Sequence, residues 1–180
     1  MQEKVLVFDT ETTGFRSDDE VLTLAVVNGV GETMVDGMYA PARKAEWPDA
    51  ERINRISPAM VAGCDPILAH REELERLFNA PDTLLVGYNI EFDIRLLAQS
   101  GIRITNPNRH DVMLAFSAFR KVPDARRGGY RWWKLTECAE YYRYDWGNTV
   151  AHGALADTLA TLFCYQKMKE PVYEEQSLFD

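Results

Sequence analysis

The sequence predicts an α/β fold, a mixed β-sheet flanked by helices, in a single domain. Short apolar runs rich in Val, Leu and Phe, typical of buried strands, are concentrated in the first part of the chain. Segments with apolar residues at helical spacing follow, and one more strand-like run lies among them. A chain of 180 residues is also long enough for one proper core and should bury about 70% of the surface that it exposes when unfolded.

Four strands are predicted with clear signals. Residues 4–9 (KVLVFD) are too short for a helix and apolar enough for a central strand that is buried on both faces. Residues 21–28 and 32–40 are two further β-type runs, and because residues 29–31 (GVG) separate them, we expect a hairpin. Residues 83–87 (TLLVG) form the fourth buried strand.

The helices are predicted from apolar stripes and from start and stop signals. Ser57 before Pro58 indicates the start of a short helix. Residues 67–79 form a longer one, and residues 90–99 form a helix that ends at Gly101. The buried stripe of the helix at 67–79 comprises Leu68, Leu74, Leu77 and Phe78. Three later segments also have helical patterns: 111–121, 133–142 and 153–168.

Composition and cysteine usage exclude several classes of protein. With 46% hydrophobic and 27% charged residues, the chain is typical of a globular protein and not of a disordered one. Cys64, Cys138 and Cys164 are odd in number and form no C-x-x-C pair, so we expect no disulfide framework, no zinc site and a cytoplasmic location. The first apolar run, residues 5–8, is too short for a signal peptide or a membrane span, so no membrane association is expected.

The formal net charge of −8 bears on possible partners. It argues against a protein that coats duplex nucleic acid with a broad basic face, because such binding neutralises many phosphates. An enzyme that holds only a strand end can instead neutralise phosphate with bound cations, and carboxylates are the groups that hold such cations.

Acidic residues follow the predicted strands. Asp9 and Glu11 stand two residues apart at the end of the first strand, and the period of two in a strand points both side chains to one face. The alternative is a pair of solvated acids before the turn sequence of residues 12–14 (TTG). Asp93 lies in the first turns of the helix after the fourth strand, where its simplest role is to complement the helix dipole.

His152 and Asp157 stand at the start of the last predicted helix. On a regular helix these two side chains are separated by about 140°, so both can reach one cleft only if His152 precedes the helix. Gly153 makes such a boundary reasonable. Alone, the histidine could equally be a surface or capping residue and Asp157 a solvated acid. The combination of all five residues is what favours a site.

The sequence resembles the DnaQ-like 3′–5′ exonucleases of the DEDDh type, within the ribonuclease H-like superfamily. The family's first motif, a buried strand followed by D-x-E-T-T-G, stands here as VLVFDTETTG, and its second, N-x-x-F-D, as Asn89, Phe92 and Asp93. The third, H-x-x-x-x-D, stands as His152 and Asp157. INRISPAMVAG (53–63) and KLTECAEYY (134–142) are weaker matches.

The resemblance implies a ribonuclease H-like, five-stranded mixed sheet flanked by helices, with the fifth strand near residues 108–110. It places a DEDDh exonuclease domain at residues 1–170, which hydrolyses phosphodiester bonds from the 3′ end of single-stranded DNA and releases nucleoside 5′-monophosphates, as in proofreading or DNA repair. Two Mg²⁺ or Mn²⁺ ions are implied. The implied catalytic residues are Asp9, Glu11, Asp93, His152 and Asp157, of which the four carboxylates hold metal and the histidine is the general base.

Contacts to the substrate are expected at two places. The resemblance puts backbone near Glu11 and Thr12 at the terminal 3′ hydroxyl and Phe15, Tyr88 or Phe92 against the end bases. It also places Asn89 among the substrate-binding residues. Residues 120–134 (RKVPDARRGGYRWWK) interleave basic and aromatic residues, a pattern that can grip a single strand. We expect Arg126, Arg127 and Arg131 to face substrate there, although a loop whose tryptophans anchor the next helix is the alternative.

Residues 171–180 form an acidic C-terminal tail whose end reads EEQSLFD. Gln176, Leu178 and Phe179 resemble the short peptides that bind the sliding clamp of bacterial replication, so a clamp or polymerase is a candidate partner; a chance match is the alternative. For the domain itself, the competing functions are an RNA-trimming exoribonuclease, a catalytically inactive nucleic-acid-binding relative and a metal phosphoesterase for small molecules.

Overall fold

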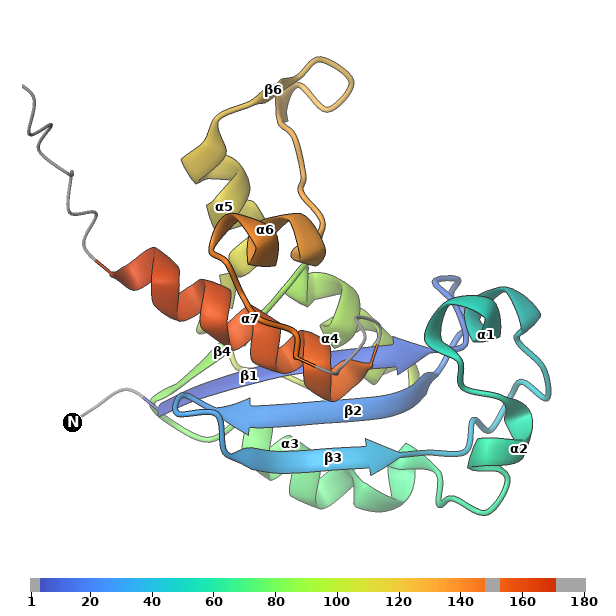
Figure 1. The fold of residues 1–180 in the computed structure, drawn as a ribbon. Coiled ribbons are helices and arrows are strands. Elements are labelled where there is room, and N and C mark those ends of the chain that lie inside the picture. The colour runs from blue at the N-terminus through green and yellow to red at the C-terminus, as the bar shows by residue number, and fades with distance from the viewer. Residues whose placement is uncertain (1–3, 148–152, 171–180) are drawn as a thin grey trace, which may run out of the picture.

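In a computed structural model that describes residues 4–147 and 153–170, five strands form one mixed sheet with helices on both faces (Figure 1). The strands are β1 (Lys4–Thr12), β2 (Val21–Asn28), β3 (Thr33–Met38), β4 (Thr83–Gly87) and β5 (Arg109–Asp111). Their spatial order is β3-β2-β1-β4-β5. The pairs β1–β2 and β2–β3 are antiparallel, whereas β1–β4 and β4–β5 are parallel. The predicted five-stranded mixed sheet is confirmed.

Helices cover both faces of this sheet. They are α1 (Pro48–Asn54), α2 (Pro58–Val61), the 3-10 helix η1 (Ile67–His70), α3 (Arg71–Phe78), α4 (Ile90–Gln99), α5 (Val112–Arg120), α6 (Leu135–Tyr141) and α7 (Ala154–Lys169). Helix α7 packs on β1 and β2, and α6 packs on α7. Helices α3 and α4 contribute to the core on the opposite face (Figure 1).

Strand β1 separates two hydrophobic clusters. Its side chains point alternately to the two faces of the sheet. Leu6 and Phe8 are buried with side chains of α3 and α4, whereas Val7 is buried with side chains of α5, α6 and α7. The alternation continues past the apolar part of the strand, so it also decides to which face each polar residue at the end of β1 points.

The sequence predicted most elements closely, but the structure differs at several places. Strand β1 runs three residues beyond the predicted end, to Thr12, because its polar end still pairs with β2. The helix predicted at residues 67–79 is divided into η1 and α3. Leu68 was assigned to its buried stripe, and this was wrong, since the side chain is 53% exposed. A 3-10 helix has three residues per turn, so the period of an α-helix does not apply there.

A hairpin projects from the body between α5 and α6 (Figure 1). Its two short strands, β6 (Pro123–Asp124) and β7 (Gly129–Tyr130), pair in antiparallel fashion. We refer to residues 120–134 as the arm. The sequence predicted a loop for this segment, and the paired strands are the difference.

The described helices include none that is long and apolar enough to cross a bilayer. All three cysteines are free thiols. The C-terminal tail lies outside the described residues, so the division of the chain at residue 170 stays a prediction.

Candidate active site

Three carboxylates meet at the end of β1. Asp9 and Glu11 point to the face that α7 covers, two and four residues beyond Val7, as the period of a strand requires. Asp157, in the first turn of α7, completes the group. One oxygen from each side chain lies within 4.8 Å of the other two. The structure therefore brings together three of the four acids that the sequence singled out.

The start of α7 places Asp157. Gly153 is the N-cap residue, and its carbonyl accepts a hydrogen bond of 3.0 Å from the backbone N–H of Asp157. An acidic residue in the first turn also complements the positive end of the helix dipole. Because α7 begins at Ala154, position 152 precedes the helix, in agreement with the boundary that the sequence analysis required. His152 itself lies outside the described residues.

Asp93 reaches the site from the other side of the sheet. It stands in the first turn of α4, a helix that packs with the opposite cluster, and its side chain is only 2% exposed. Its Oδ1 accepts two hydrogen bonds from Thr10, one of 3.0 Å from the backbone N–H and one of 2.6 Å from the hydroxyl. Thr10 faces away from Asp9 and Glu11 along the strand, so it is well placed to receive a side chain from α4.

The carboxylates raise each other's pKa values. Burial, followed by the charges of Asp93, Asp157 and Glu11, holds the pKa of Asp9 well above its ordinary range. Burial and then Asp157 and Asp93 raise the pKa of Glu11 to about 8, although a hydrogen bond with Asn54 opposes the shift. Burial raises the pKa of Asp93 to about 7, against the hydrogen bonds from Thr10.

This electrostatic arrangement is unfavourable unless positive charge is added. Several half-buried acids at one point repel one another when ionised. A divalent cation removes the repulsion and supplies the charge that keeps the acids ionised. The oxygen-only ligand set of Asp9, Glu11 and Asp157 fits hard cations such as Mg²⁺ or Mn²⁺ better than zinc.

Three supporting residues were not predicted from the sequence. Thr10 holds Asp93, as described. Asn54, at the end of α1, is buried and donates from Nδ2 to the carbonyl oxygen of Thr12 over 3.1 Å, beside its hydrogen bond with Glu11. Asp111 accepts hydrogen bonds from the backbone N–H groups of Asn89, Ile90 and Leu114, at 3.1–3.2 Å. Asn54 was within the INRIS segment noted above, which was the available signal.

Comparison with known proteins agrees with this geometry. Residues 6–165 match the sequence model of the RNase T family, whose description is exonuclease. The chain belongs to this exonuclease family. It is 26% identical over 172 residues to an uncharacterised exonuclease, CP81, of Escherichia phage 186, and the match covers 90% of this chain and 86% of that one. The resemblance to the DnaQ-like exonucleases is thereby confirmed, and the protein is a nuclease.

The fold of this exonuclease is similar to that of exonuclease I. Escherichia coli exonuclease I in complex with a dA16 oligonucleotide superposes with a TM-score of 0.71 at 20% identity, over 93% of this chain. Another structure of exonuclease I gives a TM-score of 0.72 at 21% identity, again over 93% of this chain. The chain spans only 42% and 40% of those two chains, which are therefore more than twice as long.

The turn after β1 in the exonuclease is fixed by polar contacts. Gly14 has a φ of +150°, and a Cβ atom there would lie 2.6 Å from Oδ2 of Asp19, so the turn requires glycine. Asp19 is buried and accepts hydrogen bonds of 2.7 Å from the Thr13 hydroxyl and the Arg16 backbone. Phe15 lies within this turn, and its side chain is 72% exposed.

Other residues that the sequence assigned to substrate binding lie in three different places: a cleft, the core and the turn after β1. Tyr88 and Asn89 line a cleft of about 500 Å³ that also reaches Asp157. Phe92 packs against the core cluster on the other face of the sheet, with the guanidinium of Arg95 5.2 Å from its ring centre. The hydroxyl of Thr12 donates to the carbonyl of Gly14 over 2.7 Å, so this side chain stabilises the turn.

The three arginines assigned to substrate all lie on the arm and are exposed. Arg127 is ion-paired with Asp124, and Arg131 with Glu137. The backbone N–H of Arg126 donates to Asp124 over 2.9 Å. Their role in substrate binding stays a prediction.

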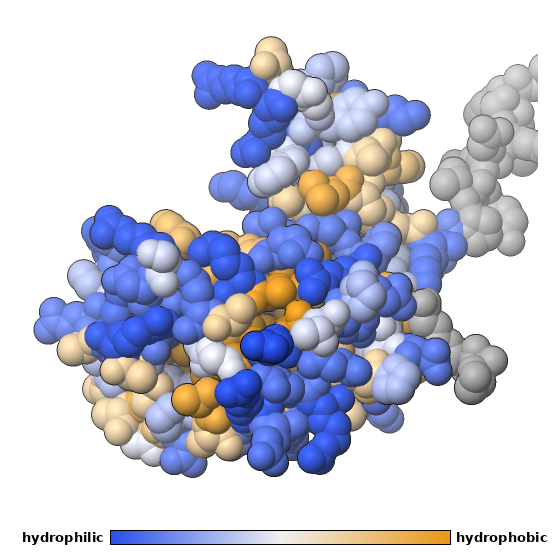
Figure 2. Space-filling view, turned by 180° about the vertical axis from the view of Figure 1, so that it is seen from behind, coloured by the Kyte–Doolittle hydropathy of each residue, from blue (hydrophilic) through white to orange (hydrophobic). Residues whose placement is uncertain are grey.

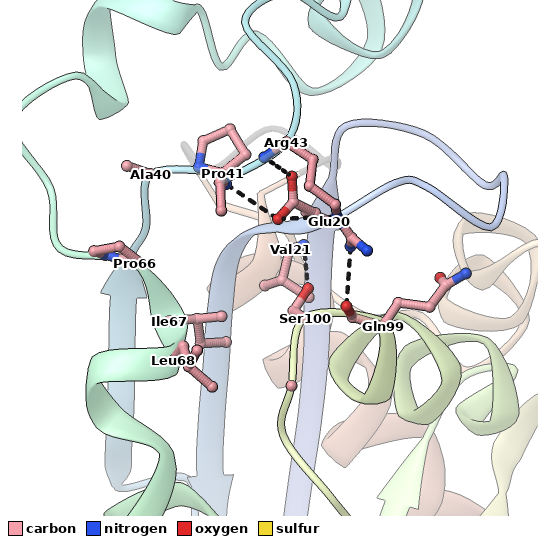
Figure 3. A pocket seen from close by; sticks show the side chains of 12 residues that line it. Glu20, Val21, Ala40, Pro41, Arg43, Pro66, Ile67, Leu68, Gln99 and Ser100 are labelled. Carbon is pink, nitrogen blue, oxygen red and sulfur yellow. Dashed lines mark hydrogen bonds and ion pairs between the residues drawn. The ribbon is translucent and has the colours of Figure 1, made fainter.

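A second cavity, of about 350 Å³, lies between η1, the end of α4 and residues 40–43 (Figure 3). Its only carboxylate is Glu20, whose oxygens accept hydrogen bonds of 3.0 and 2.7 Å from the backbone N–H groups of Ala42 and Arg43. Arg43 in turn donates to the carbonyl of Gln99 over 2.9 Å. These contacts join the start of β2 to the neighbouring loop, which is a structural role.

Proposed function

We propose that this exonuclease removes nucleotides from the 3′ end of single-stranded DNA and releases nucleoside 5′-monophosphates with the help of two Mg²⁺ or Mn²⁺ ions. The observation that carries the proposal is the group formed by Asp9, Glu11 and Asp157, with Asp93 beside it. Exonuclease I, which has a similar fold, was solved with dA16 and dT13 oligonucleotides, and this supports a single strand of DNA as the substrate. We also propose that the enzyme acts in proofreading or DNA repair.

Each carboxylate has its own part in the proposal. Asp9, Glu11, Asp93 and Asp157 would hold the two ions: Asp9 would be shared by both, Glu11 and Asp157 would serve the ion on the side of the attacking water, and Asp93 would serve the second ion. When bound, such cations would supply activation of the attacking water and neutralisation of charge on the phosphoryl oxygens. Asp93 can be held in one orientation because Thr10 fixes its Oδ1.

We assign the general base to His152, which accepts the proton of the attacking water. Activity should then fall as the pH drops through the histidine pKa, ordinarily about 6.5. His152→Asn should lose this pH dependence and slow the reaction by about 10²- to 10⁴-fold. A pH–rate profile that is the same in both proteins would refute the assignment.

The terminal nucleotide is proposed to lie between the turn after β1 and the start of α4. Backbone near Thr12 meets the 3′ hydroxyl, and Phe15, Tyr88 or Phe92 packs against the end bases. Asn89 is proposed as a further substrate-binding residue. Because aromatic stacking accepts every base, we expect little sequence preference.

Product ladders from 5′- and 3′-labelled DNA and RNA oligomers test the proposal. With Mg²⁺, 5′-labelled DNA should give a ladder that shortens from the 3′ end, and chelator should abolish it. Asp9→Ala should remain folded and be inactive. A full ladder from Asp9→Ala, or one in the presence of chelator, would exclude the two-metal mechanism. Faster cleavage of RNA would make the enzyme an exoribonuclease, and binding without cleavage would make it an inactive relative.

Clamp binding is proposed for the tail residues Gln176, Leu178 and Phe179, which lie outside the described residues. Capture of a bacterial sliding clamp by the full chain, but not by a chain lacking the last seven residues, would support it. Equal capture by both chains would refute it.

A further inference from the structure

The arm concentrates positive charge in an acidic protein. Residues 120–134 contain six of the chain's 20 Lys and Arg residues but only one of its 28 Asp and Glu residues. Within the described residues, two of the six cations, Arg127 and Arg131, are ion-paired. The remaining positive charge is available to a polyanion, whereas the rest of the chain, which is strongly acidic, would repel one.

Two of the cations lie directly beside aromatic rings. The guanidinium of Arg127 lies 4.0 Å from the ring centre of Trp132, and that of Arg131 lies 4.0 Å from the ring centre of Trp133. Trp132 and Tyr130 are each 44% exposed. Exposed rings beside guanidinium groups can stack on nucleobases while the charges contact phosphate.

The base of the arm is anchored to the body. Trp133 packs edge-on against Phe116 at 6.0 Å, and its carbonyl accepts a hydrogen bond of 2.8 Å from the hydroxyl of Tyr88. Arg120 lies 4.7 Å from the ring centres of both Trp133 and Tyr141. The sequence left open whether the arm binds a single strand or whether its tryptophans anchor the next helix. Trp133 fits the anchoring role, whereas Trp132 fits the binding role.

A cleft connects the arm to the carboxylates. The cleft of about 500 Å³ that reaches Asp157 is also lined by Trp132 and Lys134. Figure 2 shows the arm standing out from the body with hydrophilic residues gathered towards its tip and hydrophobic ones nearer its base. A strand with its last phosphate at Asp157 therefore has a path along the cleft to the exposed ring of Trp132.

We propose that the arm is a second binding region of the exonuclease, which holds the single strand on the 5′ side of the scissile phosphate and makes turnover depend on strand length. This inference rests on the proposed function, because only an enzyme that works from a 3′ end leaves the rest of the strand on the 5′ side.

Two substrates separate binding by the arm from cleavage. One is single-stranded DNA of about 20 nucleotides, longer than the site sizes of common single-strand binding folds. The other is the p-nitrophenyl ester of thymidine 5′-monophosphate, which offers one nucleotide and cannot reach the arm. The quantity compared is the kcat/KM on the oligonucleotide divided by the kcat/KM on the ester, with Mn²⁺ present.

In Trp132→Ala and Arg126→Glu, this ratio should fall about tenfold, mainly through a higher KM for the oligonucleotide. Arg126→Glu should also reduce the slope of log KM against log salt by about one. Arg76→Glu, an exposed arginine on α3, is the matched control and should leave the ratio as in the wild type. Arg126 is exposed, so Arg126→Glu should fold normally and still tests the inference if Trp132→Ala is unstable.

An unchanged ratio and salt slope in Arg126→Glu would overturn the inference. So would an equal decrease in Arg76→Glu, since the effect would then be one of net charge. Failure of the wild type to cleave either substrate would instead refute the proposed function, so the two failures are distinguishable.

Discussion

Thr10 holds Asp93 with two hydrogen bonds to the same oxygen, Oδ1. One residue of the central strand thus fixes a carboxylate that arrives from the opposite face of the sheet. With Oδ1 occupied, we expect Oδ2 to be the oxygen that faces the metal site. Asp93 is almost fully buried, so the charged form depends on these donors and on bound cations.

Replacement of Thr10 by Val should therefore affect catalysis without removing a catalytic group. The variant keeps the shape of the side chain and the backbone bond but loses the hydroxyl bond of 2.6 Å. Loss of a hydrogen bond that orients a metal ligand typically costs about 10- to 100-fold in activity or metal affinity. We expect a decrease of that size in kcat and in Mg²⁺ affinity, measured by steady-state kinetics over a range of Mg²⁺ concentrations.

Thr10→Ser is the matched control, because it keeps the hydroxyl and should retain most of the activity. If Thr10→Val and Thr10→Ser have the same kcat and the same Mg²⁺ dependence, the hydroxyl does not position Asp93.

The raised pKa values of Glu11, about 8, and Asp93, about 7, predict the pH dependence of stability without metal. In the unfolded chain both acids lose their protons at a pH of about 4. The folded protein keeps these protons to higher pH, so its stability is fully present below pH 4 and is lost as the pH rises through about 7 and 8. The melting temperature in chelator should accordingly decrease from pH 5 to pH 9.

Mg²⁺ should reverse this decrease, since cations that bind only the folded state stabilise it, by about 2.7 kcal/mol at a hundredfold excess over Kd. The rise in melting temperature on addition of Mg²⁺ should be larger at pH 8 than at pH 5. Thermal unfolding of the wild type and of Asp9→Asn at both pH values measures it, and the variant should show a smaller effect. A Mg²⁺ effect that does not depend on pH would contradict the prediction.

How much of the site the sequence could predict depends on the distance between the residues along the chain. Asp9 and Glu11 share one strand, and the period of two was enough to place them on one face. Asp157 could be assigned only with the family motif, because the packing of α7 on β1 is not visible in either segment alone. The approach of Asp93 from the other face was not predicted, since it depends on how α4 packs.

The predicted helices and strands also differ in how well they match the structure. The predicted bounds of β2, β4 and α4 match the structure because each is a buried run with clear ends. The exposure of Leu68 was not predicted, because the sequence pattern was interpreted as one α-helix. Leu68 lies in the 3-10 helix η1, which has a different number of residues per turn. The β6–β7 hairpin of the arm was missed as well: each strand has only two residues, which is too short for a pattern.

Asn54 provides a further test of the site. Its amide donates to the carbonyl of Thr12 and is hydrogen-bonded with Glu11, so it positions the end of β1 from outside the sheet. Asn54→Ala should lower kcat about 10- to 100-fold, with a smaller effect on KM for a long oligonucleotide. Asn54→Asp, which adds a negative charge beside Glu11, should be at least as impaired and should need more Mg²⁺. Wild-type kinetics in both variants would show that Asn54 serves only the local loop.

Asp111 should be important for stability more than for chemistry. Its carboxylate caps α5 through Leu114 and also accepts the N–H groups of Asn89 and Ile90 at the start of α4, so it joins β5 to the segment that carries Asp93. Loss of a helix cap costs about 1 kcal/mol, and the two further donors would be left without their acceptor. Asp111→Ala should therefore lower the free energy of unfolding by about 2–3 kcal/mol, whereas Asp111→Asn, which keeps one oxygen acceptor, should lose less. Urea unfolding of both variants measures this difference. Equal stabilities of Asp111→Ala and the wild type would mean that water replaces the carboxylate at no cost, and the link between β5 and α4 would not be needed to hold Asp93 in place.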